Sequence, residues 1–302
     1  MLDVRRLRVL AAIDATGSFS AAAQSLALTQ SAVSQHIAAL ERAVGLPLVE
    51  RGSRPVQLTD TGFALSRHAA GIFARLDAAE QELAEIAGRR HGRLRFGCFP
   101  TMLATLMPPA FARFRTQHPD VRLIIVDDHL HRLLPRLDAG ELDLAIIYDH
   151  DALGDVGARD LLRTPLLEDR FQAVLPTAHP LAQRSSPLHL RDLRNESWIG
   201  GAASSAWYRI VRHACTQAGF TPTAAFASDD YIAVQALVAA GLGVSVIPGL
   251  AVAHPLPGVA VRQLASGAPV RRISAASVPG GYQGPALAAM IESLCSAAKQ
   301  WT

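Results

Sequence analysis

The segment from Gln30 to Val44 places the strongest constraint on the fold, because its side chains divide between two faces of one helix. Thr29 is a favourable N-cap for this helix and Gly45 a favourable stop. Apolar residues at helical spacing predict a buried stripe: Val33, Ile37, Leu40 and Val44. Small or hydrogen-bonding residues occupy the other face: Gln30, Ser31, Ser34, Gln35 and Ala38. Such amides and hydroxyls can bond to base edges in a major groove, so the pattern predicts a DNA-reading helix.

The flanking sequence fits a helix-turn-helix with a wing. An amphipathic helix is expected over residues 4–16, and Ser20 is expected to cap a short helix over residues 21–26. Residues 46–58 read as two short apolar strands around a turn rich in Gly, Ser and Pro. Two basic residues at its tip could reach phosphates or a narrow minor groove: Arg51 and Arg54. The alternative is a helical packing module whose polar face is only solvated.

Ordered motifs in this region resemble the winged helix-turn-helix of LysR-type transcriptional regulators. They read GSFSAAA at 17–23, TQSAVSQHI at 29–37, LE at 40–41 and LTDTG at 58–62. The resemblance implies a sequence-specific DNA-binding regulator that responds to a small-molecule effector. We therefore predict that the following residues contact DNA: Ser20, Gln30, Ser31, Ser34, Gln35, Arg51, Arg54 and Thr59.

Composition is compatible with a two-part protein of this kind. The 302 residues are 50% hydrophobic, enough for a sizeable core, whereas the net charge of +3 argues only weakly for a nucleic-acid partner. Charged residues interrupt the start of the chain and no long uncharged run follows, so we expect a cytoplasmic protein without a membrane segment.

Cysteine and histidine patterns give weaker signals. The cysteines Cys98, Cys215 and Cys295 are widely spaced and lack a CxxC motif, which indicates reduced thiols, although a thiol switch at Cys98 near a cleft mouth stays an alternative. Residues 127–131 contain metal-ligand types, but solvated loop residues are the simpler interpretation. We expect no metal, no cofactor and no catalytic residue.

A long helix is expected from Asp60 to Ala87. Its apolar positions follow a heptad seam: Leu65, Ala69, Ile72, Leu76, Ala79, Leu83 and Ile86. The polar segment 88–93 reads as a flexible linker that would leave the helix standing clear, so pairing with a second copy is favoured over packing on its own chain. In the resembled family this helix is the dimerisation element, and tetramers are usual. Two paired reading helices would match an interrupted palindromic operator.

From Leu94 onward short apolar strands alternate with helices, which predicts an α/β architecture with mostly parallel sheets. One helix is expected over 103–118 and others over 131–139, 205–219 and 232–240. The region is similar to the family's effector domain, which resembles type 2 periplasmic binding proteins with two lobes around a cleft. We place the crossovers near 164–167 and 265–271. The predicted domains are 1–59 (DNA binding), 60–90 (linker helix and hinge) and 91–302 (effector binding), with lobe 1 at 91–164 and 268–302 and lobe 2 at 165–267.

A ligand in such a fold is expected where strand ends lead into helix N-termini. Four hydroxyls are candidates for effector contacts: Thr101, Ser204, Ser205 and Ser228. Each could instead be only a helix cap. Asp229 and Asp230 could repel an acid, so the ligand charge stays open. The alternative function is an α/β enzyme or a solute-binding protein that uses the same cleft, but the sequence contains no GxSxG, P-loop or HExxH motif.

Overall fold

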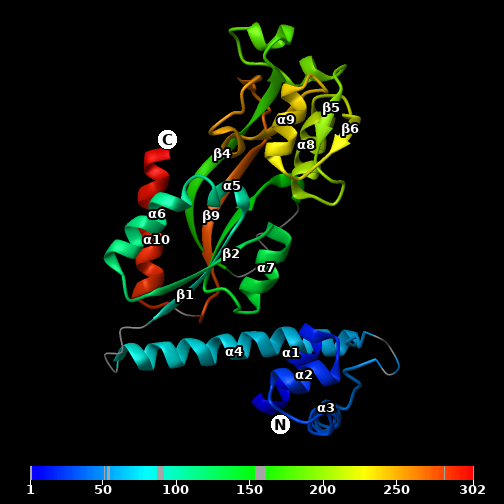
Figure 1. Ribbon diagram of the computed structural model, residues 1–302, viewed down its shortest axis with the longest axis vertical. Helices are drawn as coiled ribbons and strands as arrows, with labels where there is room; N and C mark the ends of the chain where they lie inside the picture. The colour runs from blue at the N-terminus through cyan, green and yellow to red at the C-terminus, as the bar shows by residue number, and fades with distance from the viewer. Residues whose placement is uncertain are drawn as a thin grey trace.

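A computed structural model describes residues 2–50, 52, 55–86, 92–153, 161–281 and 283–301. A small helical domain and a long helix, α4 (Asp60–Ile86), lie beneath a larger α/β domain (Figure 1). No helix in these described ranges is both long and apolar enough to cross a membrane.

The small domain contains α1 (Val4–Thr16), α2 (Phe19–Ser25) and α3 (Gln30–Val44). The expected cap of α2 is wrong: Ser18, not Ser20, has the extended backbone of an N-cap, and its Oγ accepts a hydrogen bond from the backbone N–H of Ala21 at 3.3 Å. Ser20 lies inside the first helical turn and is exposed. The short helix therefore begins two residues earlier than predicted.

The two-faced helix is confirmed. Thr29 Oγ1 caps α3 by accepting a hydrogen bond from the Ala32 N–H at 3.1 Å, and Gly45 ends the helix with a φ of +78°. Val33, Ile37 and Leu40 are buried, and Val44 packs against the same core. Burial of this stripe fixes which face of α3 points outward.

The predicted wing is less regular than expected. Instead of two strands, the described residues form one antiparallel bridge between Val49 and Leu58. Two backbone hydrogen bonds join its sides, from the Glu50 N–H to the Gln57 oxygen at 2.9 Å and from the Thr59 N–H to the Leu48 oxygen at 3.0 Å, and Leu48 and Val49 are buried. Arg51 and Arg54 lie outside the described residues.

Helix α4 joins the two domains by packing on both. Its first half contacts α1 and buries Ala69 in the small domain's core, with Leu65 packed beside it. The expectation that it stands clear is wrong, because Ala74 is buried and Ala78 packs against the core of the large domain. The rest of the seam stays exposed in a single chain at Ile72, Leu76 and Leu83.

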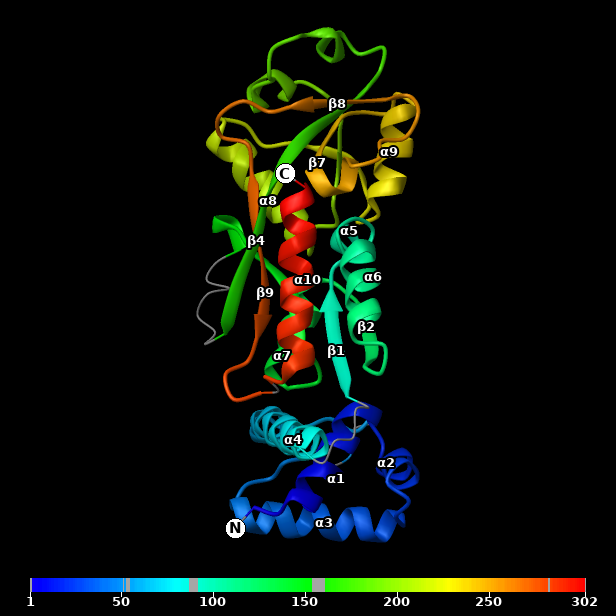
Figure 2. The same ribbon diagram turned by 90° about the vertical axis from the view of Figure 1, so that its left-hand side faces the viewer.

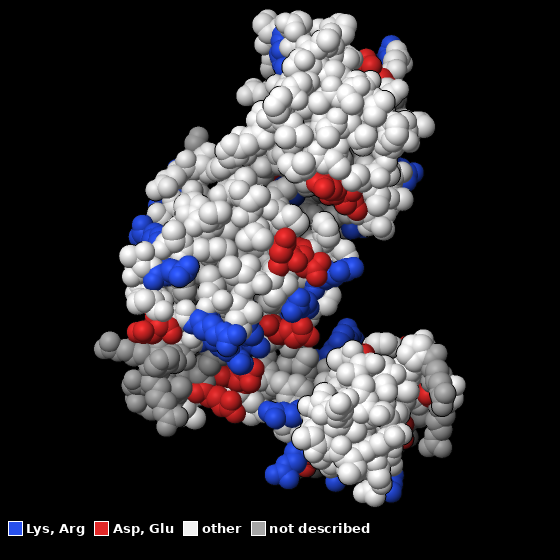
Figure 3. Space-filling view, viewed as in Figure 1, with Lys and Arg blue, Asp and Glu red and all other residues white. Residues whose placement is uncertain are grey.

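Charged residues hold the large domain onto α4, and Figure 3 shows basic and acidic side chains gathered at this junction. Asp77 Oδ2 accepts hydrogen bonds from Arg93 Nη2 at 2.7 Å and from Arg95 Nη1 at 3.4 Å. Arg95 Nη2 also bonds to the buried Asp143 at 2.6 Å. The Gly140 turn comes so close that a Cβ there would lie 1.8 Å from the Cβ of Ala74.

The main sheet of the large domain has the strand order β2-β1-β3-β9-β4-β7, and β8 also pairs with β4. Its strands are β1 (Arg93–Cys98), β2 (Arg122–Asp127), β3 (Leu144–Asp149), β4 (Leu162–Pro176), β7 (Ser245–Pro248), β8 (Val259–Gln263) and β9 (Val270–Ser277). A second sheet pairs β5 (Trp198–Gly200) with β6 (Ala224–Ala227).

The expectation of mostly parallel sheets is wrong. Among the described strands, β1–β2, β1–β3 and β5–β6 are parallel, whereas every pair that includes β4 or β9 is antiparallel. The reason is topological: β4 carries the chain into the second lobe and β9 brings it back, so the two run in opposite directions side by side. Both strands pass through the lobe boundary, as Figure 2 shows.

Helices cover the sheets in both lobes. In the first lobe they are α5 (Pro100–Leu103), α6 (Met107–Gln117), α7 (Leu130–Asp138) and α10 (Pro285–Trp301), and in the second α8 (Ala206–Gln217) and α9 (Tyr231–Ala239). Short 3₁₀ helices are η1 (Asp151–Leu153), η3 (Pro180–Gln183), η4 (Leu190–Leu193) and η5 (Gly249–Val252). The helix expected over 103–118 is α6, which begins only at Met107, because residues 104–106 form a turn after the short α5.

Close packing at Gly62 gives a test of how the small domain is held to α4. A Cβ at Gly62 would lie 2.1 Å from the carbonyl oxygen of Leu48, which is backbone and cannot swing away. We expect Gly62→Ala to lower the free energy of unfolding of this domain by about 1–3 kcal/mol. Urea titration followed by circular dichroism would measure this.

Gly71→Ala is the matched control, because a Cβ at Gly71 on the same helix meets nothing within 4 Å. It should leave stability unchanged or raise it by about 0.5–1 kcal/mol. Equal effects of the two substitutions would show that the contact with Leu48 is not tight.

Candidate functional site

The outward face of α3 carries most of the residues predicted to contact DNA. Gln30, Ser31, Ser34 and Gln35 are all exposed, and no side-chain hydrogen bond within the described chain engages them. Their amides and hydroxyls therefore remain available to a partner. Because the stripe beneath them is buried, the four side chains form one continuous polar surface.

Of the two other predicted DNA contacts that the structure describes, Thr59 has a structural role. Thr59 Oγ1 donates a hydrogen bond to the Pro47 carbonyl oxygen at 2.7 Å and accepts one from the Gly62 N–H at 3.1 Å. These bonds tie the start of α4 to the segment before it. Ser20 is exposed on α2. Whether either side chain also contacts DNA stays a prediction.

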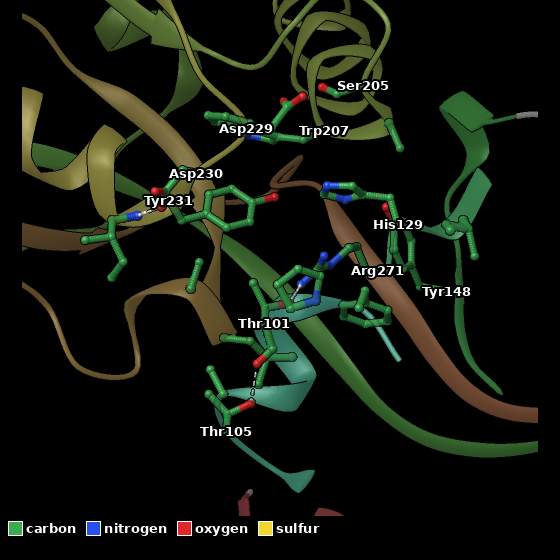
Figure 4. Close-up of a pocket in the computed structure, with 18 of the residues that line it drawn as sticks. Thr101, Thr105, His129, Tyr148, Ser205, Trp207, Asp229, Asp230, Tyr231 and Arg271 are labelled. Carbon is green, nitrogen blue, oxygen red and sulfur yellow. Dashed lines mark hydrogen bonds between the residues drawn. The ribbon is translucent and has the colours of Figure 1, made fainter. Parts of the chain in front are cut away.

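A cavity of about 790 Å³ lies between the two lobes of the large domain. The first lobe supplies residues from α5 and the loop before α7, and the second supplies the N-terminal ends of α8 and α9. Three of the four predicted effector-binding hydroxyls line it: Thr101, Ser204 and Ser205. Ser228 does not, and its Oγ accepts a hydrogen bond from the backbone N–H of Asp230 at 3.2 Å. Figure 4 shows the arrangement of the central side chains.

The helix caps around the cavity differ from those expected. Ser205 caps α8, accepting a hydrogen bond from the Tyr208 N–H at 3.0 Å, whereas Ser204 is not the cap. Asp230 caps α9 through bonds from the N–H groups of Ile232 and Ala233 at 2.8 and 3.4 Å. Thr101 is not a cap: it lies within α5 and is buried. Its hydroxyl must therefore have another role.

That role is a hydrogen bond to a buried arginine. Arg271 Nη2 donates to Thr101 Oγ1 at 3.1 Å, and Arg271 Nε donates to Asp169 Oδ2 at 3.1 Å. A second bond runs from Arg271 Nη2 to the same carboxylate oxygen at 2.5 Å. Asp169 on β4 and Arg271 on β9 face each other in register, so the pair bridges the two crossover strands. The other oxygen of Asp169 accepts the Leu250 N–H of the second lobe at 3.0 Å.

Aromatic rings surround the guanidinium of Arg271. Its central carbon lies 5.0, 4.9 and 5.8 Å from the ring centres of Phe99, Tyr148 and Phe171. Arg271 and Asp169 are only 3% and 4% exposed, so the charges rely on each other and on these rings rather than on water. Burial lowers the pKa of Arg271, but the neighbouring Asp169 carboxylate and the two nearby tyrosines raise it, and the net shift is upward. The guanidinium therefore stays charged.

Two tyrosines of the cavity stay protonated because they are buried. Burial raises the pKa of Tyr148, although the positive charge of Arg271 opposes this. Burial also raises the pKa of Tyr231, whose ring packs edge-on against Trp207 at 5.0 Å between ring centres. Both phenols are neutral hydrogen-bond donors near neutral pH.

Sequence reasoning missed Arg271 and both tyrosines as cavity residues. Arg271 and Asp169 are 102 positions apart, and each sits in a strand segment that contains other charged residues. Two adjacent arginines, Arg271 and Arg272, in an otherwise apolar strand were the available signal, but a single sequence does not name their partners. Tyr148 ends one apolar run and Tyr231 precedes another, so neither stands out from ordinary core aromatics.

The cysteine and metal alternatives gain no support from the geometry. Cys98 is fully buried at the end of β1 rather than at a cleft mouth, and burial raises the pKa of its thiol. Cys215 is also buried, and burial raises its thiol pKa to about 12. Among the described residues, His, Cys, Asp and Glu form no group of three placed to hold a metal ion.

Comparisons with known proteins agree with this architecture. Residues 4–63 match the family described as "Bacterial regulatory helix-turn-helix protein, lysR family". Residues 87–299 match the family described as "LysR substrate binding domain". The chain belongs to the LysR family of bacterial transcriptional regulators. It is thus a LysR-type regulator with an effector-binding domain, as the motifs predicted.

Named relatives of this LysR-type regulator span most of its length. It is 30% identical to "Probable HTH-type transcriptional regulator LrrA" of Synechococcus elongatus over 294 residues, covering 97% of this chain and 96% of the relative. It is also 30% identical to "Transcriptional dual regulator GltC" of Bacillus subtilis, covering 72% of this chain and 71% of GltC.

Solved structures of similar fold support the full-length arrangement. A full-length OxyR variant from Pseudomonas aeruginosa has a TM-score of 0.73 at 24% identity and covers 98% of both chains. Full-length CbnR complexed with its target DNA has a TM-score of 0.64 at 20% identity, covering 98% of this chain and all of CbnR. At these identities the likeness concerns the fold alone.

The buried ion pair predicts a large stability effect from a single atom change. Asp169→Asn keeps the shape but leaves Arg271 charged, buried and without a counter-ion. We expect the free energy of unfolding of the large domain to fall by about 3–5 kcal/mol. Thermal and urea unfolding of the full-length protein, followed by tryptophan fluorescence, would measure this, because all three tryptophans lie in that domain.

The neighbouring Glu168→Gln is the matched control. Glu168 pairs with Arg170 at 3.5 Å, but both side chains are more than half exposed, so their attraction contributes about 0–1 kcal/mol. An Asp169→Asn protein as stable as this control would show that the buried pair is not needed for the fold.

Proposed function

We propose that this regulator reads double-stranded DNA through the exposed face of α3, and that a small molecule in the cavity between the lobes controls it. The observation that carries the first part is the polar surface of Gln30, Ser31, Ser34 and Gln35 above a buried apolar stripe. CbnR, of similar fold, is described as complexed with its target DNA. A role in binding DNA also supports a location in the cytoplasm.

We further propose that α4 joins two copies of the chain. Its apolar side chains at Ile72, Leu76 and Leu83 are 37%, 40% and 66% exposed in the single chain. Burying this stripe against a second copy removes apolar surface from water and sets two α3 helices side by side. An interrupted palindromic operator would match that symmetry. Further contacts between large domains would then give a tetramer.

We propose the predicted domain boundaries: residues 1–59 bind DNA, residues 60–90 form the linker helix and hinge, and residues 91–302 bind the effector. We place lobe 1 at 91–164 and 268–302 and lobe 2 at 165–267. We also propose that the chain is not an enzyme. What supports this is that its relatives are named as transcriptional regulators.

Base readout by α3 can be tested with two substitutions. Gln30→Ala and Gln35→Ala remove amides that can bond to bases, so each should weaken operator binding by about 1–3 kcal/mol and relax preference at particular base pairs. Gel-shift titrations against a panel of single-base operator variants would measure both effects.

Gln117→Ala is the control, since Gln117 is an equally exposed glutamine at the end of α6 in the large domain. Its affinity and base preference should equal those of the unaltered protein. If all three variants gave the unaltered base preference, α3 would not be the reading helix.

Pairing through α4 can be tested by placing a charge in the seam. Leu76→Glu would bury two like charges across a two-fold axis, so we expect the assembly to dissociate and operator affinity to fall although no DNA contact changes. Sedimentation velocity would report the assembly state. Leu242→Glu, at a residue that is 43% exposed in a turn of the second lobe, should leave the assembly intact. An unchanged assembly in Leu76→Glu would exclude the seam as the interface.

A further inference from the structure

The inner end of the cavity has more hydrogen-bond donors than acceptors. The carboxylate bound to Arg271 is that of Asp169, which does not line the cavity, and both of its oxygens already accept bonds, from Arg271 and from the Leu250 N–H. The Thr101 oxygen accepts a bond from Arg271, and no described atom accepts the proton of the Thr101 hydroxyl. The Tyr231 hydroxyl makes no hydrogen bond to the described residues. A ligand that supplies acceptors can satisfy these donors.

Arg271 adds a charged donor to this set. Its Nε and Nη2 are engaged by Asp169 and Thr101, and the guanidinium also makes a side-chain hydrogen bond with the Tyr148 phenol. The neutral Tyr148 phenol lies against the guanidinium as well. In Figure 4 the Tyr231 hydroxyl points into the space above Arg271 and Thr101. Arginine, tyrosine and threonine donors thus face the same space from β9, α9 and α5.

The acidic residues of the cavity lie at its second-lobe end, where Figure 4 also shows Asp230 next to Tyr231. Asp229 and Asp230 are exposed, and each uses one carboxylate oxygen to accept backbone N–H bonds, from Ala202 at 3.1 Å and from Ile232 at 2.8 Å. Figure 4 places Asp229 beside Ser205 and Trp207, away from Thr101. Negative charge at this end opposes a second acid group on the ligand.

Aromatic and aliphatic walls fill the space between the two ends. Phe99, Tyr148, Trp207 and Tyr231 line it, and Leu250 and Ile232 add aliphatic surface. Walls of this kind suit a flat apolar body, which can stack on rings or meet them edge-on.

We propose that the effector is an aromatic monocarboxylate whose carboxylate binds Arg271, Tyr231 and Thr101 and whose ring lies between Trp207 and Phe99. This inference rests on the proposed role of the cavity as the effector site. One carboxylate offers about four acceptor positions, enough for the donors present. A phosphate dianion would bring twice the charge to an arginine already neutralised by Asp169, and a dicarboxylate would place its second charge near Asp229 and Asp230.

Calorimetric titration of the full-length protein tests the ligand class. The probes are benzoate, 3-phenylpropionate and 1-naphthoate, each with its primary amide, together with phthalate and inorganic phosphate. We expect at least one monocarboxylate to bind saturably, and its amide, phthalate and phosphate to bind at least about tenfold more weakly. Equal binding of acid and amide, preference for a dianion, or no saturable binding of any monocarboxylate would overturn the proposal.

Tyr231→Phe tests the position of the carboxylate. Because the Tyr231 hydroxyl has no partner among the described residues, its loss should leave the melting temperature unchanged while weakening the monocarboxylate about tenfold. Tyr208→Phe, outside the cavity lining on α8, should bind as the unaltered protein does. Unchanged binding in Tyr231→Phe would overturn the assignment of the donor set.

Gel shifts with the same preparations separate this inference from the proposed function. Operator binding that persists while every monocarboxylate fails would overturn the ligand class alone. If the unaltered protein did not bind the operator, this result would instead contradict the proposed DNA-reading role.

Discussion

The buried pair of Asp169 and Arg271 is the interaction on which the large domain depends. It joins the two strands that carry the chain between lobes, and its remaining hydrogen bonds reach Thr101 in one lobe and the Leu250 N–H in the other. Both side chains are almost completely buried, so removing one partner would leave the other uncompensated. The same pair therefore sets the geometry of the lobe boundary, and its arginine lines the cavity.

Strand β1 places that cavity at a fixed distance from the linker helix. Its first residues, Arg93 and Arg95, bond to Asp77 of α4, and the residue after its last one, Phe99, lines the cavity. Figure 2 shows β1 running from the level of α4 up to α5. Because a paired strand is stiff along its length, a displacement of α5 is not absorbed within β1. Such a displacement would therefore be transmitted to α4 through the hydrogen bonds of Asp77 with β1.

The sequence predicted those parts of the structure that depend on local pattern. The stripe of α3, its caps at Thr29 and Gly45, and the extent of α4 follow from spacing within one helix. Only part of the candidate site was predicted. Thr101, Ser204 and Ser205 could be named because each follows the end of a predicted strand, which is a local feature of the sequence. Arg271 and the docking of Gly140 on Ala74 depend on contacts between distant segments, which no local pattern records. The direction of β9 was missed for the same reason.

The placement of donors across the lobes explains how a ligand in the cavity could bias their arrangement. A ligand shifts an equilibrium between two lobe angles only if its contacts differ between them. Thr101 belongs to the first lobe, Tyr231 belongs to the second, and Arg271 lies on a crossover strand between them. An acceptor group can form hydrogen bonds with all three residues at only one separation of Thr101 and Tyr231. At any other separation of the lobes it loses at least one of these hydrogen bonds. Since Asp169 holds Arg271 in place, the lobes rather than the arginine must move to complete the set.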